Sequence, residues 1–105
     1  MSRLPQLMKL LALDPNDTFV LYGLAAEHAK VGNHAEAVSW YRKCLAADPA
    51  YLYAYFHMAK SLQAMGNLAE ARAVVADGVK EAHRAGDGKA IGELSQYQVE
   101  LAEVG

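Results

Sequence analysis

The sequence predicts an all-α protein built as a stack of antiparallel helix pairs. The chain of 105 residues repeats itself 34 residues on, where Asp14-Pro15 returns as Asp48-Pro49 and Gly32-Asn33 returns as Gly66-Asn67. Between these markers, apolar residues recur at spacings of three and four, which is the period of an amphipathic helix. Residues that favour strands, such as Val, Ile and Thr, are few. One small domain is therefore expected.

The first expected element is a helix within residues 3–15. Leu10 and Asp14-Pro15 occupy the places that Cys44 and Asp48-Pro49 occupy in the next unit, so this segment is interpreted as the second helix of a truncated unit. We expect it to cover the N-terminal end of the stack. Its apolar residues are Leu4, Leu7, Met8 and Leu11.

The first full unit is expected over residues 18–51, as two helices with a tight turn between them. Gly32 ends the first helix, because glycine adopts the left-handed conformation without a Cβ penalty. Asn33 can cap the next helix, and Pro49 ends it, since the residue before a proline avoids helical geometry. A short connection of this kind makes the two helices antiparallel neighbours.

The second full unit is expected over residues 52–85. Gly66 and Asn67 repeat the turn between its two helices. His83 stands where the closing proline would be, so we expect the second helix to continue toward Ala85.

A last helix is expected within residues 88–104. Asp87 can cap its first turn, because a carboxylate oxygen accepts from the free backbone N–H groups there. We expect this helix to close the C-terminal end of the stack with an apolar stripe. The stripe consists of Ile91, Leu94, Tyr97, Leu101 and Val104.

A small residue is expected wherever two helices cross closely, because only small side chains let the backbones approach. Alanine occupies matching places in both units, and a bulky replacement there should cost about 1–3 kcal/mol through overpacking. The four alanines are Ala25, Ala37, Ala59 and Ala71.

Together these features resemble the tetratricopeptide repeat family. The 34-residue period, the Gly-Asn turn, the start of the second helix at Ala35-Glu36-Ala37 and the closing Asp-Pro are typical of it. The resemblance covers two full units, with Gly78 and His83 as departures in the second. It implies a right-handed α-solenoid of six helices, with a capping helix at each end. It also implies a module that binds other proteins, with no enzyme activity.

Composition and motifs argue against several other functions. The net charge of -2 gives no general attraction to nucleic acid or to an anionic membrane. No apolar stretch is long enough to span a membrane. The single cysteine, Cys44, cannot form an internal disulfide, which fits a reducing compartment. A cytoplasmic protein is therefore expected. No metal, cofactor or catalytic motif is present. Cys44 is interpreted as a buried apolar residue, and Asp14 and Asp48 as turn residues.

The resemblance further implies that the first helix of each unit lines a concave groove that binds partners. Tyrosine and phenylalanine suit such a groove, because they offer a large contact area at a low entropic cost. The alternative is that these rings pack on the N-terminal helix, on the C-terminal helix or on a second copy of the chain, because an aromatic residue at helical spacing usually belongs to a core. The residues placed in the groove are Phe19, Tyr22, Lys30, Tyr53, Phe56, His57 and Lys60.

Some chaperone adaptors of this family hold the C-terminal carboxylate of a peptide with a clamp of lysine, asparagine and arginine. Here Tyr22 and Ala26 stand where the first lysine and asparagine would stand, and His57 replaces the second asparagine. We therefore expect no preference for a free peptide C-terminus.

Two functions from different classes follow. The first is a non-catalytic module that binds a peptide or a helix of a partner protein in the groove. The second is a structural scaffold that forms a homodimer through the groove or the C-terminal helix, because two repeats leave apolar surface uncovered. A third hypothesis is an enzyme or ligand-binding domain whose groove holds a small apolar molecule, with His57 and Lys60 as polar contacts.

Overall fold

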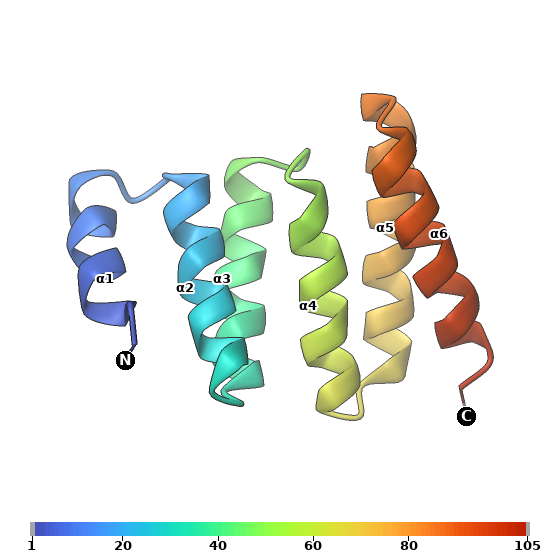
Figure 1. The fold of residues 1–105 in the computed structure, drawn as a ribbon, viewed down its shortest axis with the longest axis horizontal. Helices are drawn as coiled ribbons and strands as arrows, with labels where there is room; N and C mark the ends of the chain where they lie inside the picture. The colour runs from blue at the N-terminus through green and yellow to red at the C-terminus, as the bar shows by residue number, and fades with distance from the viewer. Residues whose placement is uncertain (1, 105) are drawn as a thin grey trace.

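The computed structural model describes residues 2–104, which form six α-helices joined by short turns. Each helix packs against the next, and the stack advances in one direction from the N-terminus to the C-terminus (Figure 1). The helices are α1 (Leu4–Leu13), α2 (Thr18–Lys30), α3 (His34–Ala47), α4 (Leu52–Ala64), α5 (Leu68–Ala85) and α6 (Gly88–Ala102).

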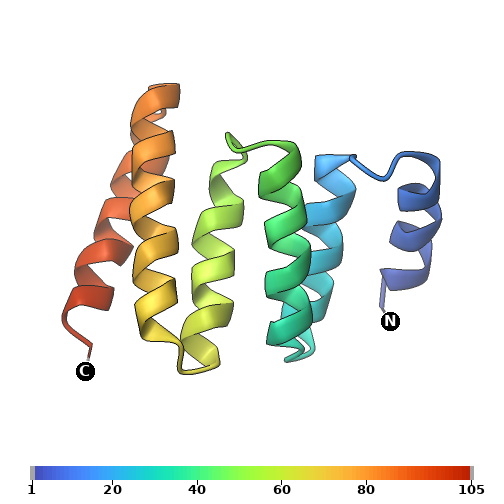
Figure 2. The same cartoon turned by 180° about the vertical axis from the view of Figure 1, so that it is seen from behind.

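The helices of the stack form two layers. The inner layer consists of α2, α4 and α6, which face the viewer in Figure 1. The outer layer contains α3 and α5, which come to the front when the molecule is seen from behind in Figure 2. α4 contacts both α2 and α6 directly. The predicted all-α stack of helix pairs is therefore confirmed.

Glycine makes the turn inside each helix pair. Gly32 and Gly66 have φ angles of 84° and 79°, a conformation that residues with a Cβ rarely adopt. Asn67 then caps α5 by accepting a 3.3 Å hydrogen bond from the Glu70 N–H, while its Nδ2 donates to Glu70 Oε2 over 2.9 Å. Asn33 makes no such side-chain bond, so the cap expected there was wrong. α3 begins on backbone hydrogen bonds alone.

Small residues lie at the centre of the core, where neighbouring helices cross. Gly78 on α5 belongs with them, because a Cβ on this residue would lie only 2.7 Å from Cβ of Tyr55 on α4. Position 78 therefore has glycine rather than alanine, because the Tyr55 side chain leaves no room for a Cβ there. Larger side chains such as Leu24 and Leu62 fill the space around them. The fully buried alanines include Ala25, Ala37, Ala59 and Ala71.

The second helix of the second pair is longer than that of the first, as the missing proline at His83 predicted. α5 continues to Ala85, where Gly86 ends it with a φ of 67°. Asp87 then caps α6 by accepting a 3.0 Å hydrogen bond from the backbone N–H of Ala90. The last helix therefore begins one residue after its cap, at Gly88.

A side chain from α5 holds the C-terminal end of α6. Arg72 donates hydrogen bonds of 3.0 Å to the carbonyl of Leu101 and 2.6 Å to the carbonyl of Val104. The carbonyls at the end of a helix lack an N–H one turn further on, so the guanidinium supplements the single 3.4 Å bond that the Leu101 carbonyl accepts from the Val104 N–H. Val104 lies beyond Ala102, the last residue of α6, and is exposed, so its place in the apolar stripe was wrong. The stripe is buried at Leu94, Tyr97 and Leu101 and partly buried at Ile91.

At the other end, α1 contacts α2 alone among the described helices. Leu7 is buried there, and its side chain lies 3.3 Å from the point that a Cβ on Gly23 would occupy. The absence of a side chain at Gly23 lets the two helices approach. Met8 is exposed, so the apolar side of α1 that is actually covered is narrower than expected.

Candidate binding face

A continuous row of aromatic rings crosses the three helices of the inner layer. Tyr22 of α2 lies 6.0 Å from the ring of His57 on α4, measured between ring centroids. His57 lies 5.3 Å from Phe56, and Phe56 lies 5.1 Å from Tyr97 on α6. All three separations fall within the range of attractive ring contacts. We name this row the aromatic ladder: Tyr22, His57, Phe56 and Tyr97.

The first ring of the ladder is fixed from behind. Tyr22 contacts Tyr51, at 5.0 Å, and Tyr41 of α3, at 5.8 Å. Tyr41 is fully buried, whereas Tyr22 is half-buried. One side of the Tyr22 ring therefore packs on the core, and the other side belongs to the surface of the inner layer.

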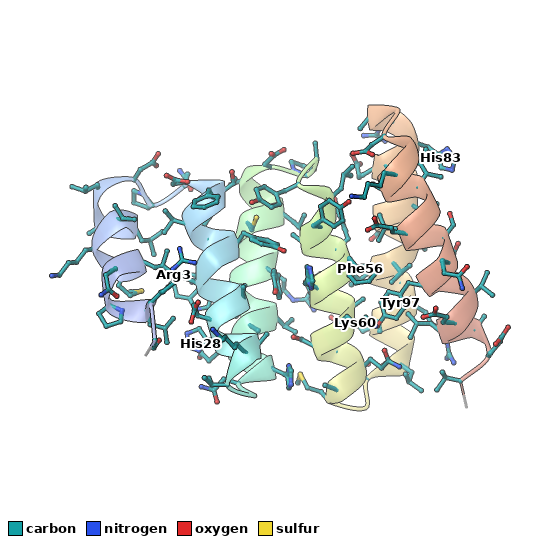
Figure 3. The ribbon with its side chains drawn as sticks, viewed as in Figure 1. Arg3, His28, Phe56, Lys60, His83 and Tyr97 are labelled. Carbon is teal, nitrogen blue, oxygen red and sulfur yellow. The ribbon has the colours of Figure 1, made fainter. Side chains whose placement is uncertain are left out.

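A lysine covers the other end of the ladder. The ammonium nitrogen of Lys60 lies 4.4 Å from the ring centre of Tyr97 and 5.4 Å from that of Phe56, both within cation–π distance. The Tyr97 hydroxyl donates a 2.7 Å hydrogen bond to Oε1 of Gln63. Figure 3 shows Phe56, Lys60 and Tyr97 gathered between α4 and α6.

A cleft of about 580 Å³ opens beside this end of the ladder. Phe56 and Tyr97 provide its aromatic wall. Gly88 and Gly92 of α6 also line the cleft, and a Cβ on either would meet no atom within 4 Å, so the space beside them is open. We name it the α6 cleft; it is also lined by Lys89, Glu93, Gln96 and Glu100.

His57 is held in its neutral form at pH 7. Burial lowers its pKa below the ordinary value of 6.5, and the nearby positive charge of Lys60 lowers the pKa further. The imidazole therefore acts in the ladder as an uncharged aromatic ring. The ammonium group of Lys60 supplies the positive charge of this part of the surface.

The structure brings together four of the seven residues that the sequence placed in a groove: Tyr22, Phe56, His57 and Lys60. Phe19 and Tyr53 do not join the ladder. Their side chains point to solvent, with exposed fractions of 65% and 37%. Lys30 is exposed at the last residue of α2. Phe56 packs against Tyr97 of the C-terminal helix α6, and the Tyr22, Phe56 and His57 side chains are all half-buried.

Sequence reasoning missed Tyr97 and Tyr51 as parts of this face. Tyr97 belongs to the apolar stripe of the last helix, and it was expected in the core for that reason. It is indeed buried, but its hydroxyl and one ring face reach Gln63 and Lys60 on the inner layer. A tyrosine within an otherwise aliphatic stripe is a signal for such a role, since its hydroxyl needs a polar partner.

Cys44, Asp14 and Asp48 have structural roles. Cys44 is buried, its Sγ lies 3.6 Å from the Thr18 carbonyl, and burial raises its pKa to about 11, so the thiol stays protonated. Asp14 and Asp48 accept hydrogen bonds from the backbone N–H groups of Asn16 and Ala50, as expected of turn residues.

Residues 2–104 contain no group of three or more side chains placed to hold a metal ion. They also contain no helix able to cross a membrane.

Helix pairs stacked in two layers around small residues define this chain as an α-solenoid repeat protein. The chain belongs to the tetratricopeptide repeat family, whose sequence profile matches residues 28–91. It is 29% identical over 91 residues to a TPR repeat-containing protein of Pseudomonas aeruginosa, and the match covers 87% of each chain.

Solved structures of other repeat proteins have the same fold. A tetratricopeptide repeat domain protein from Salinibacter ruber superposes with a TM-score of 0.81 at 28% identity, covering 88% of this chain and 93% of its own. The TPR2B domain of yeast Sti1, solved in complex with pHsp70, superposes with a TM-score of 0.85 at 21% identity. That match covers 92% of this chain and 78% of the yeast chain, and it concerns the fold alone.

Proposed function

We propose that this protein is a non-catalytic interaction module that binds a peptide or a helix of a partner protein across the inner layer. The observation that carries the proposal is the aromatic ladder with Lys60 at its end. Half-buried rings keep their positions without a partner, so little conformational entropy is lost when one binds. The α6 cleft offers room for one apolar side chain of the partner beside Phe56.

Membership of the tetratricopeptide repeat family supports this function. The TPR2B domain of yeast Sti1, which shares the fold, is solved with pHsp70 bound. Within the ladder, the half-buried rings of Tyr22 and Phe56 have the character of interface anchors, because aromatic residues in partly desolvated positions carry much of the energy of binding. The cytoplasmic location expected from the sequence is compatible with such a role and remains a prediction.

A peptide library panned against the whole chain tests this proposal. Peptides selected on the wild type are measured by fluorescence anisotropy against Phe56→Ala and Tyr22→Ala, and we expect each substitution to weaken binding by about tenfold or more. Met65→Ala is the matched control, because Met65 is an exposed apolar residue at the far end of α4. Circular dichroism checks that the helices of every variant remain formed.

The outcome of this test is decisive in both directions. Selective loss of binding in the Phe56 and Tyr22 variants supports the proposal. Peptides that bind all variants equally well, or a library that yields no binder, would overturn it.

We also propose that the site does not require a free peptide C-terminus. Each selected peptide is measured with a carboxylate and with an amide at its end, and we expect affinities within about threefold of each other. The Lys60→Met variant is measured with both forms. A large loss in this variant that occurs only with the free carboxylate would contradict the proposal, because Lys60 would then hold that carboxylate.

A further inference from the structure

The outer layer has a groove of its own, on the side of the molecule away from the aromatic ladder. It lies between α3 and α5, which stand in front of α4 in Figure 2, and it has a volume of about 350 Å³. This volume is at the lower end of the range for ligand pockets, so the groove has room for a single side chain rather than a helix. We name it the outer groove: Leu45 and Ala46 of α3, Tyr55 and Met58 of α4 and Val74 of α5 form it, between Arg42 and Asp77.

The floor of the outer groove is apolar. Tyr55, Met58 and Val74 are 8%, 4% and 7% exposed, so each turns only a small part of its side chain toward the groove. Leu45 is half-buried beside them, and Ala46 is exposed at the edge. An occupant of the groove therefore needs an apolar portion to pack on this floor.

The two ends of the outer groove differ in charge. α3 and α5 run in the same direction, so Arg42 and Glu70 belong to one end and Asp77 to the other (Figure 2). Arg42 forms an ion pair with Glu70, which neutralises the charge at its end. Asp77 is exposed and forms no ion pair within residues 2–104, although Lys80 follows it one turn later on α5. A positive charge is therefore favoured at the Asp77 end.

Further charged side chains lie near this end, around the Tyr55 hydroxyl. Burial raises the pKa of Tyr55, nearby negative charges raise it further, and a nearby positive charge lowers it. The negative charges belong to Glu81, Asp77 and Asp48, and the positive charge belongs to Arg84. Arg84 forms a 3.2 Å ion pair with Glu81, so the carboxylates of Asp77 and Asp48 remain. This end of the groove is therefore anionic.

The polar atoms at the anionic end can only accept hydrogen bonds. The Tyr55 hydroxyl donates its proton to the carbonyl of Pro49 over 2.7 Å, so its oxygen is left as an acceptor. The carboxylate of Asp77 is an acceptor as well. An occupant must therefore bring donors to this end, which neither an apolar nor an acidic side chain can do.

We propose that the outer groove binds an arginine side chain of a partner protein. The aliphatic part of the arginine packs on the apolar floor, and its guanidinium reaches the carboxylate of Asp77 and the hydroxyl oxygen of Tyr55. Arginine fits better than lysine, because its planar guanidinium has five N–H donors and can form two parallel hydrogen bonds with one carboxylate. This site belongs to the outer layer and does not depend on the function proposed for the aromatic ladder.

Nuclear magnetic resonance on the whole, isotope-labelled chain tests the proposal with the blocked peptide Ac-Ala-Ala-Arg-Ala-Ala-NH2. We expect saturable shifts of the Ala46 and Asp77 amides with a Kd of about 1–10 mM, because one side chain and one exposed ion pair contribute little energy. Peptides with lysine, or with the uncharged analogue citrulline, in place of arginine should bind at least about threefold more weakly. The variant Tyr22→Ala should bind the arginine peptide normally, which separates this site from the ladder.

Two variants of the groove, each with a matched control, locate the binding site. Asp77→Asn keeps the shape of the side chain but removes its charge, so we expect about fivefold weaker binding. Its control is Glu36→Gln, which removes a negative charge from an exposed site elsewhere on the outer layer. Ala46→Phe fills the groove and should abolish binding, whereas Ala47→Phe, at the exposed neighbouring residue outside the groove, should bind as the wild type. Circular dichroism checks that every variant keeps its helices.

Several results would overturn the proposal. The wild type could show no saturable shift, or it could bind the citrulline or the lysine peptide as tightly as the arginine peptide. Unchanged binding by Asp77→Asn or by Ala46→Phe would also contradict it. Free L-arginine should bind no more tightly than the blocked peptide, and tighter binding would assign the groove to the free amino acid instead of a partner protein.

Discussion

The hydroxyl of Tyr97 on α6 donates a 2.7 Å hydrogen bond to Oε1 of Gln63 on α4, and this bond joins two helices of the inner layer directly. It fixes the Tyr97 ring 5.1 Å from Phe56 and 4.4 Å from the Lys60 ammonium nitrogen. The last helix therefore does more than cover the core. It also supplies one end of the aromatic ladder.

Removing this hydroxyl with Tyr97→Phe should lower the free energy of unfolding by about 0.5–1.5 kcal/mol, the usual net contribution of one hydrogen bond. The ring remains, so the ladder and its cation–π contact should persist. Urea denaturation measures the loss, and Tyr53→Phe provides the control, because Tyr53 lies outside the ladder and is exposed. Equal stability of the Tyr97→Phe variant and the wild type would show that the bond contributes nothing.

Two glycines in helices of the stack should respond to alanine in opposite ways. Gly78→Ala places a Cβ 2.7 Å from Cβ of Tyr55, so we expect it to destabilise the protein by about 1–3 kcal/mol through overpacking. Gly92→Ala meets no atom within 4 Å, so we expect it to stabilise α6 by about 0.5–1 kcal/mol through helix propensity. Thermal denaturation of both variants checks the difference in sign, and a shift in the same direction for both contradicts it.

The sequence predicted the helices well, because the signals for them are local. Gly32, Gly66 and Asp87 each act within one turn of the chain, and they mark the turns and the cap that the structure shows. The face was predicted only in part, because which ring lies beside which depends on helix crossings. Spacing along one helix could not separate Phe19, which points to solvent, from Tyr22, which Tyr51 and Tyr41 hold in place.

The guanidinium of Arg72 should hold the end of α6 in place. Arg72→Met keeps most of the aliphatic side chain but removes the bonds to the Leu101 and Val104 carbonyls. We expect faster amide hydrogen exchange in the last turn of α6 and a loss of about 1 kcal/mol in the free energy of unfolding. Lys80→Met, an exposed change on the same helix, serves as control. Unchanged exchange in that turn argues that the helix end needs no such cap.

The buried thiol of Cys44 should make stability depend on pH in the alkaline range. Burial, together with the negative charge of the nearby Asp48, raises its pKa from 9.0 to about 11. In the unfolded chain the thiol loses its proton near pH 9, whereas the folded protein retains it until about pH 11. The free energy contributed by the protonated thiol is thus fully present below pH 9 and is lost between pH 9 and 11. The loss should be about 2–3 kcal/mol.

Urea denaturation of the wild type and of Cys44→Ala between pH 8 and 11 measures this loss. The tyrosines also titrate in this range, but both proteins contain them, so the difference between the two pH profiles belongs to Cys44. The variant starts from a lower stability, because it leaves a small cavity. Its free energy of unfolding should nevertheless fall less steeply with pH than that of the wild type. A thiol reagent at pH 8 should label the native protein only as fast as it opens, because the buried sulfur is neither accessible nor ionised. Parallel pH profiles together with rapid labelling would place Cys44 at the surface, contrary to the packing described above.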